Sequence, residues 1–338
     1  MFKERLLMKI FSILLLTCTF AFADAKQDNY VDNILDASGI KIDHNALNAS
    51  KIISIAREDQ EKTDSSIALS MALYLKAPYK DVLEELKRSS NRVSNYKHAF
   101  SHEIKKDKNI KKYFKDAYLL PDEDDEIKRL KTYNGGGEFN LSKDEIKLLN
   151  KLRKEHKDIA KLFFKQILFQ RTKAYMQDGI HGITAYEHCD HGDTLKDGFK
   201  GSSIGMKVFR KKFPNMYNYF MNYPKVQSLK QFDEHFYVIK DKIDKRVTFL
   251  LKHQIIEQKP NITLIAEREF YISNSLDGIQ TEILCTPYKE GTFIALSAQS
   301  YTDRVAGFSR KIAVKFGRNA MKEQILPLFQ NLQKKFHH

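Results

Sequence analysis

Catalytic motifs and cysteines are scarce in this chain. Its 338 residues include three cysteines, far fewer than a disulfide-built secreted domain carries. It has no Walker-type glycine-rich loop, no H-E-x-x-H and no C-x-x-C. We interpret Gly201–Gly205 (GSSIG) as a loop and not as the nucleophile elbow of a hydrolase. No catalytic residue is therefore predicted, and an enzyme is a less favoured class than a binding protein.

Long hydrophobic runs are absent beyond the N-terminus. Residues 1–23 start with three basic side chains, continue through the apolar run Ile10–Leu16 and end in an Ala-x-Ala sequence at Ala23. This pattern is typical of a cleaved secretory signal peptide. No later run approaches the roughly 18 apolar residues that a transmembrane helix needs. Cys18 follows Leu-Leu-Thr, where a lipoprotein has a smaller residue, so we predict a periplasmic or secreted protein without a lipid anchor.

The chain has an excess of basic residues, with a net charge of +14 and a pI near 9.3. An exported basic protein is attracted to anionic lipid headgroups. The lysines are spread along the whole chain, which favours an ordinary basic surface for most of them. Nucleic acid is not an expected partner outside the cytoplasm, and the sequence does not indicate an oligomeric state.

Two cysteines, Cys189 and Cys285, remain after the predicted cleavage. An oxidising compartment permits a disulfide between them. Separate burial of two thiols is equally compatible with their spacing. Both alternatives stay open at this point.

The region from about His235 to Asp303 predicts an antiparallel meander. Tight-turn sequences containing Pro, Asn or Asp-Gly separate four extended segments, Val247–Glu257, Ile262–Ile272, Ile279–Cys285 and Thr292–Tyr301. Apolar and polar residues alternate in these segments, as in half-buried strands. Such a sheet needs a cover on one face.

The flanking regions predict a strand pair and several helices. We expect strands at Lys51–Ala56 and Ile67–Leu75, and then a helix at Tyr79–Arg88 that follows Pro78. A capping box at Ser142 and Glu145 opens the longest helix signal, Lys143 to about Asp178, with Gly179 as its C-cap. Further helices are expected at Tyr30–Asp36, 203–223 and Ala306–Ile325, the last of which Pro327 ends. Its apolar stripe is Phe308, Ile312, Phe316 and Met321.

This order of elements resembles the START-like or helix-grip fold, in which a curved antiparallel sheet wraps a long C-terminal helix. Ile67–Arg88 and Glu267–Ile312 carry the resemblance. We therefore predict an α+β fold built from residues 24–98 and 226–338, with residues 99–225 as a mainly helical insertion. Phe270–Asp277 (FYISNSLD) is also similar to a strand in a group of exported bacterial proteins of unknown function, with Asn274 where they have histidine.

The resemblance implies binding of a lipid-like or other apolar small molecule. Arg268 falls by alternation on the apolar face of its strand, where it would meet a phosphate or carboxylate. The alternatives for Arg268 are a salt bridge to Glu257 or Glu282, or a bend that turns it outward. Candidate aromatic residues of the cavity wall are Tyr271, Phe249 and Tyr301.

One cluster has the residue types of a metal site. The segment Tyr186–Asp193 (YEHCDHGD) offers His188, His191 and Asp193, with His181 as a fourth ligand. Adjacent donors cannot all point at one ion, so a polar surface loop is the alternative, and no other cofactor is expected. The functions considered are thus an exported carrier of a lipid-like molecule, an envelope interaction or structural protein without a small ligand, and a metal-dependent hydrolase or cyclase.

Overall fold

The computed structural model describes residues 43–61, 65–89, 91, 93–188, 195–205, 207–227, 230–243, 245–302 and 310–336, together with Val31 and Asn33. The predicted signal peptide lies outside these residues. So does most of the short helix predicted at Tyr30–Asp36. The first described helix is α2, His44–Asn48, which Asp43 caps by accepting hydrogen bonds from two backbone N–H groups.

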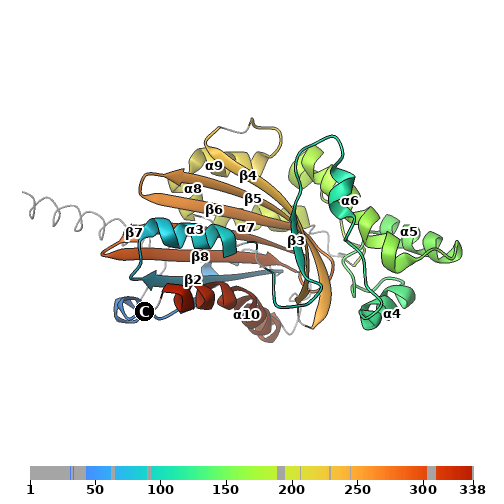
Figure 1. The fold of residues 1–338 in the computed structure, drawn as a ribbon, viewed down its shortest axis with the longest axis horizontal. Helices are drawn as coiled ribbons and strands as arrows, with labels where there is room; N and C mark the ends of the chain where they lie inside the picture. The colour runs from blue at the N-terminus through green and yellow to red at the C-terminus, as the bar shows by residue number, and fades with distance from the viewer. Residues whose placement is uncertain are drawn as a thin grey trace, which may run out of the picture.

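An eight-stranded antiparallel sheet is the centre of the fold (Figure 1). Its spatial order is β1-β2-β8-β7-β6-β5-β4-β3, so the second strand pairs with both the first strand and the last. The strands are β1 Ile53–Ala56, β2 Ser66–Leu75, β3 Phe100–Glu103, β4 Phe232–Ile243, β5 Arg246–Lys259, β6 Ile262–Ile272, β7 Gly278–Tyr288 and β8 Gly291–Tyr301. The predicted α+β class, strand pair and meander are confirmed. The edge strand β3 lies inside the predicted helical insertion, and its short charged sequence did not signal it.

Helices α3, Tyr79–Ser89, and α10, Arg310–Phe336, pack on one face of the sheet. Alternate residues of β2, such as Ile67 and Leu73, meet the buried face of α3, which includes Leu86. The α3 helix follows Pro78 and has Asp81 in its first turn, as the sequence predicted. These contacts cover the β2, β8 and β7 part of this face.

The insertion packs on the other face. Phenylalanine and tyrosine side chains from its helices, such as Phe164 and Tyr175, form a large core with the alternate face of the strands. In Figure 1, α8 and α9 lie behind β5 and β6, while α4 and α5 extend beyond the β3 edge. The helices of the insertion are α4 Asp124–Thr132, α5 Lys143–Lys154, α6 Ile159–Asp178, α7 Leu195–Gly205, α8 Lys207–Lys212 and α9 Pro214–Asn222. Short 3-10 turns occur at η1 Glu58–Gln60, η2 Ile110–Phe114 and η3 Gly179–Gly182.

The prediction of one helix from Lys143 to Asp178 was wrong, because the chain breaks between α5 and α6. His156 has a φ of 53°, which an α-helix does not accommodate. Asp158 then caps α6 by accepting a hydrogen bond from the backbone of Lys161. The predicted capping box at Ser142 and Glu145 is confirmed. Gly179 ends α6 as predicted.

The region predicted as helix at 203–223 also contains a break at Phe213, between α8 and α9. Gly201–Gly205 belongs to α7 and is therefore helical, so the loop predicted there was wrong. A nucleophile elbow needs a sharp strand-to-helix turn, and this backbone does not supply one. Pro214, the first residue of α9, is the sequence signal of the boundary between α8 and α9, although apolar residues continue across it.

The C-terminal helix differs from its prediction in two ways. It continues through Pro327 to Phe336; Phe329 and Leu332 are fully buried beyond the proline, and this packing offsets the lost backbone hydrogen bond. The predicted apolar stripe was wrong in part, because Met321 is buried but Ile312 and Phe316 are 64% and 69% exposed. Phe308 lies outside the described residues. The buried stripe consists of Val314, Met321, Phe329 and Leu332.

No helix in the described part of the chain is both long enough and apolar enough to span a bilayer.

Candidate functional site

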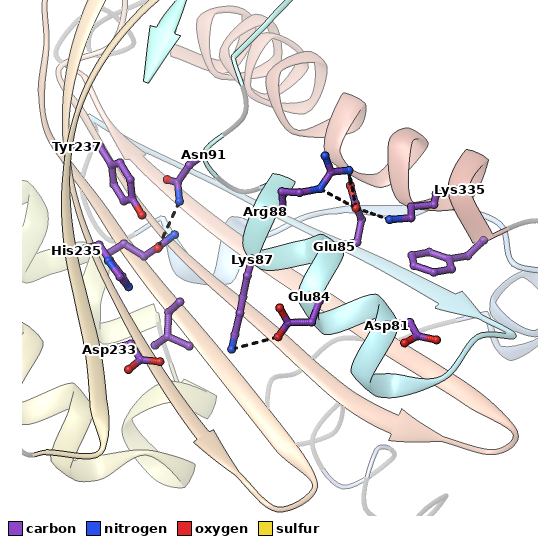
Figure 2. Close-up of a pocket in the computed structure, with 13 residues that line it drawn as sticks. Asp81, Glu84, Glu85, Lys87, Arg88, Asn91, Asp233, His235, Tyr237 and Lys335 are labelled. Carbon is purple, nitrogen blue, oxygen red and sulfur yellow. Dashed lines mark hydrogen bonds and ion pairs between the residues drawn. The ribbon is translucent and has the colours of Figure 1, made fainter. Parts of the chain in front are cut away.

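A groove of about 820 Å³ lies between α3, the C-terminal end of α10 and strands β4 and β5. It forms where α3 and α10 leave the β4–β5 part of the sheet uncovered. Figure 2 shows α3 side chains along one wall and β4 side chains facing them. The volume lies within the range of small-molecule sites. Its lining residues are Asp81, Glu84, Glu85, Lys87, Arg88, Asn91, Asp233, His235, Tyr237, Gln254, Ile256, Lys335 and Phe336.

The basic side chains of the groove are each held by a carboxylate of the protein. Glu85 is buried and accepts hydrogen bonds from Arg88 at 2.6 Å and Lys335 at 2.6 Å. Burial raises the pKa of Glu85, but the hydrogen bonds from Lys335, Arg88 and Ser89 outweigh it and bring the pKa to about 2. Lys87 lies 3.8 Å from Glu84. This part of the wall is therefore a network that ties α3 to the end of α10.

Two carboxylates of the groove have no ion-pair partner among the described residues. They are Asp81 on α3 and Asp233 on β4, both exposed to solvent. Figure 2 places them on opposite walls. His235 lies two residues from Asp233 on the same face of β4. Its Nδ1 lies 2.7 Å from the Glu103 carboxylate. The uncompensated charge of the groove is thus negative, although the chain as a whole has a net charge of +14.

The sheet below the groove holds a largely buried cluster of one lysine and two carboxylates. Lys252 lies 3.4 Å from Glu267 and 3.8 Å from Glu269, so one ammonium faces two carboxylates. Burial, together with the charge of Glu267, raises the pKa of Glu269 in spite of Lys252. Burial also raises the pKa of Tyr237, and the carboxylates of Glu103 and Glu267 raise it further, to about 12. Glu267 is 6% exposed, so its carboxylate is buried in the sheet.

Arg268 lies on the apolar face of β6, as its alternation predicted, but on the face opposite the groove. It is fully buried and forms no ion pair with any described carboxylate. Its Nε donates to Gln280 at 2.8 Å, and its Nη1 donates to the Tyr175 hydroxyl at 2.9 Å and to the Phe220 carbonyl at 3.1 Å. The guanidinium also lies 4.1 Å from the centre of the Phe220 ring. The predicted alternatives, a bridge to Glu257 or Glu282 or an outward turn, are not what the structure shows.

Arg268 is one end of a buried hydrogen-bond chain. Because its N–H groups can only donate, the Tyr175 hydroxyl accepts from Arg268 and donates to Nδ1 of His253 at 2.9 Å. The Nε2–H of His253 then donates to Glu234 at 3.0 Å. Burial lowers the pKa of His253 to about 4, against the opposing effect of Glu234. Arg268 is thus a structural cation inside a filled core, with its donors directed at protein atoms.

The three aromatic residues predicted as cavity walls are core residues. Tyr271 is buried under the guanidinium of Arg171, which lies 4.3 Å from its ring centre. Phe249 packs against Phe164 with ring centres 4.5 Å apart. Tyr301 is buried where α7 crosses β8, so close that a Cβ on Gly198 would meet its ring. None of the three lines the groove.

The predicted metal ligands are only partly described. His181 lies on η3 and is exposed, whereas His188 is half-buried with Nε2 3.5 Å from Asp277. His191 and Asp193 lie outside the described residues. Within the part of the chain that the structure describes, no three His, Cys, Asp or Glu side chains are grouped as metal ligands.

Cys285 is buried and free, which favours separate burial over a bridge to Cys189, the two alternatives that the sequence left open. Cys189 itself lies outside the described residues. Burial raises the pKa of the Cys285 thiol far above its ordinary value, so this cysteine is chemically inert. Asn274, the position of the expected histidine, is also buried, where its amide donates to the Val247 carbonyl at 2.9 Å.

Sequence reasoning did not identify the groove. Its residues come from α3, β4, β5 and the last turn of α10, and no motif connects segments so far apart in the chain. One signal was present: charged and polar residues on a strand face, at Asp233, His235 and Gln254, mark a face that no helix covers.

Compared with known proteins, the chain matches no family model, no curated protein and no solved structure.

Proposed function

We propose that this chain is an exported binding protein that holds a small amphipathic cation in the groove between α3, α10 and β4–β5. The observation that carries the proposal is the pair of unpaired carboxylates, Asp81 and Asp233, on opposite walls of a groove whose basic side chains are all engaged. An amine or quaternary ammonium group would meet this charge, and Tyr237, Ile256 and Phe336 offer it apolar contact.

The position of the groove agrees with the resemblance to helix-grip proteins. There the ligand lies between the curved sheet and the C-terminal helix, and here α10 supplies Lys335 and Phe336 to the groove. The resemblance alone implies a carrier of an apolar lipid. The lining restricts the class of ligand further, because most of the lining side chains are charged or polar. A purely apolar ligand would strip water from these groups without replacing their hydrogen bonds.

Binding is favoured over catalysis because the ionisable groups of the groove are engaged in fixed pairs or are open to solvent. A general base needs a pKa near the working pH, whereas Glu85 has a pKa of about 2. The acid–imidazole–hydroxyl order of Glu234, His253 and Tyr175 is present on the other face, but Tyr175 and His253 are fully buried. A substrate reaches that hydroxyl only if the core opens.

Calorimetric titration with three surfactants of one chain length tests the proposal. Dodecyltrimethylammonium, dodecyl maltoside and dodecyl sulfate share one alkyl chain and carry a cationic, a neutral and an anionic headgroup, and each is used below its micelle concentration. We expect the cationic surfactant to bind most tightly. Asp233→Asn should lower its affinity by about tenfold, because the variant loses roughly one charge contact. Asp144→Asn is the matched control, since Asp144 is 89% exposed on α5, far from the groove. Equal binding of maltoside and cation, unchanged in Asp233→Asn, would contradict the proposal.

A further inference from the structure

The first half of α10 exposes two large apolar side chains one helical turn apart. Ile312 is 64% exposed and Phe316 is 69% exposed. Among the described residues, the one other exposed large hydrophobic side chain is Leu162 on α6, at 42%. Residues four apart lie on the same side of a helix, so Ile312 and Phe316 form one apolar strip.

The packing of α10 does not require this strip. The helix is held to the sheet by Val314 and Met321 in this half and by Phe329 and Leu332 in the other. Those residues lie on the side of the helix that faces β2 and α3. Ile312 and Phe316 lie on the outer side, where exposure of an isoleucine and a phenylalanine to water is unfavourable.

Lysines flank the apolar strip. Lys311, Lys315 and Lys322 are exposed, and none of them forms an ion pair with a described residue. Elsewhere helical lysines do find partners, as Lys128 does with Asp124 at 2.6 Å. Glu323 is the acidic residue of this side and lies at its far end. We name Lys311, Ile312, Lys315, Phe316 and Lys322 the basic face of α10.

We propose that the basic face of α10 docks on the surface of an anionic lipid bilayer. An interfacial helix places apolar side chains at the boundary between headgroups and acyl chains, while its lysines contact lipid phosphates. Lysine suits this role because its flexible, hydrated ammonium meets phosphates without fixed geometry. A second copy of the chain is a poor occupant, since its own lysines would be repelled. The inference is independent of the ligand of the groove.

Tryptophan fluorescence tests this docking directly, because the chain contains no tryptophan. The exported chain, purified after processing, carries Phe316→Trp in one variant and Leu162→Trp in the matched control. Vesicles contain phosphatidylcholine alone or with about one third phosphatidylglycerol. We expect the Phe316→Trp emission to shift to shorter wavelength with anionic vesicles only and to return in high salt, while Leu162→Trp does not respond. An unresponsive Phe316→Trp, an equal response of both variants, or a shift that depends on protein concentration without vesicles would overturn the inference.

Charge reversal provides a second test of the same surface. Lys311→Glu/Lys315→Glu is expected to reduce cosedimentation with anionic vesicles by at least about tenfold, since each surface lysine contributes about 1 kcal/mol. The control is Lys143→Glu/Lys147→Glu on α5, which changes the net charge by the same amount. Its two lysines are also four residues apart and exposed. An equal loss in both double variants would assign the attraction to net charge, and the basic face would not be a docking site.

Discussion

The hydroxyl of Tyr175 lies 2.9 Å from Nδ1 of His253, a hydrogen bond that joins α6 of the insertion to β5 of the sheet. Both residues are fully buried. The same hydroxyl accepts a hydrogen bond from Arg268. One tyrosine therefore satisfies a buried cation and a buried neutral imidazole, and it fixes the insertion to the sheet.

Removing this hydroxyl is expected to destabilise the fold. Tyr175→Phe leaves His253 without its donor and Arg268 without one of its acceptors, at a cost of about 1–3 kcal/mol. Urea denaturation followed by circular dichroism measures the change in the free energy of unfolding. Tyr217→Phe is the control, because the Tyr217 hydroxyl forms no hydrogen bond with the described residues although its ring is half-buried. Equal stability of both variants and the parent would show that the Tyr175 contact contributes nothing.

Acid is expected to weaken the fold through His253. Its pKa is lowered from 6.5 to about 4 by burial, so between these values the unfolded chain binds a proton that the folded chain does not. The stability is complete above pH 6.5 and is lost as the pH falls towards 4, by up to about 3 kcal/mol. His253→Gln should flatten this part of the stability curve, measured by urea denaturation at a series of pH values. The exposed His181→Gln variant should follow the parent, and a parent curve that is flat from pH 6.5 to 4 would contradict the assignment.

Alkaline pH is expected to weaken the fold through Glu282. Burial raises its pKa from 4.5 to about 8. The backbone N–H of Phe209 and the charge of Arg57 lower this pKa, but their effect is smaller. Between these values the folded chain keeps a proton that the unfolded chain releases, so stability falls as the pH rises from 4.5 through 8. Glu282→Gln keeps the shape without the charge, and its thermal midpoint should exceed that of the parent increasingly up to about pH 8. A constant difference across this range would show that Glu282 is ionised in the fold.

Replacing the proline inside α10 is expected to stabilise the fold. Pro327 cannot donate to the backbone carbonyl four residues earlier, and it is exposed. Pro327→Ala restores that hydrogen bond and should stabilise the fold by about 1–2 kcal/mol, after part of the gain is offset by the more flexible unfolded chain. Gln330→Ala, also exposed on α10, should change the free energy of unfolding by less. A destabilised Pro327→Ala variant would mean that the proline is required for the packing of Phe329.

Local patterns in the sequence predicted the framework of the fold. Alternation and turn residues located β2 and β5 to β8, and Ser142 with Glu145 located the start of α5, because these signals act over a few residues. Arg268 was placed correctly on the apolar face for the same reason. Its partners were not predictable, since Tyr175 and Phe220 approach it only through the packing of the insertion.

Tertiary contacts decided the features that local patterns missed. The break at His156 and the continuation of α10 through Pro327 depend on what each segment packs against. The groove likewise depends on how far α3 and α10 extend over the sheet. The resemblance in element order predicted a ligand site lined by Arg268 and three aromatic residues, none of which lines the groove. The polar lining of the groove becomes apparent only when β4 and α3 face each other.

Native mass spectrometry of the exported chain, purified from its own envelope, tests the central claim most directly. The parent should carry a small ligand near one per chain, and solvent extraction should release a molecule that bears a cationic group. Asp81→Asn/Asp233→Asn should lose this ligand, while Asp144→Asn keeps it. A parent without ligand that also takes up none from a total envelope extract would contradict the account, as would a neutral lipid that the Asp81→Asn/Asp233→Asn variant retains.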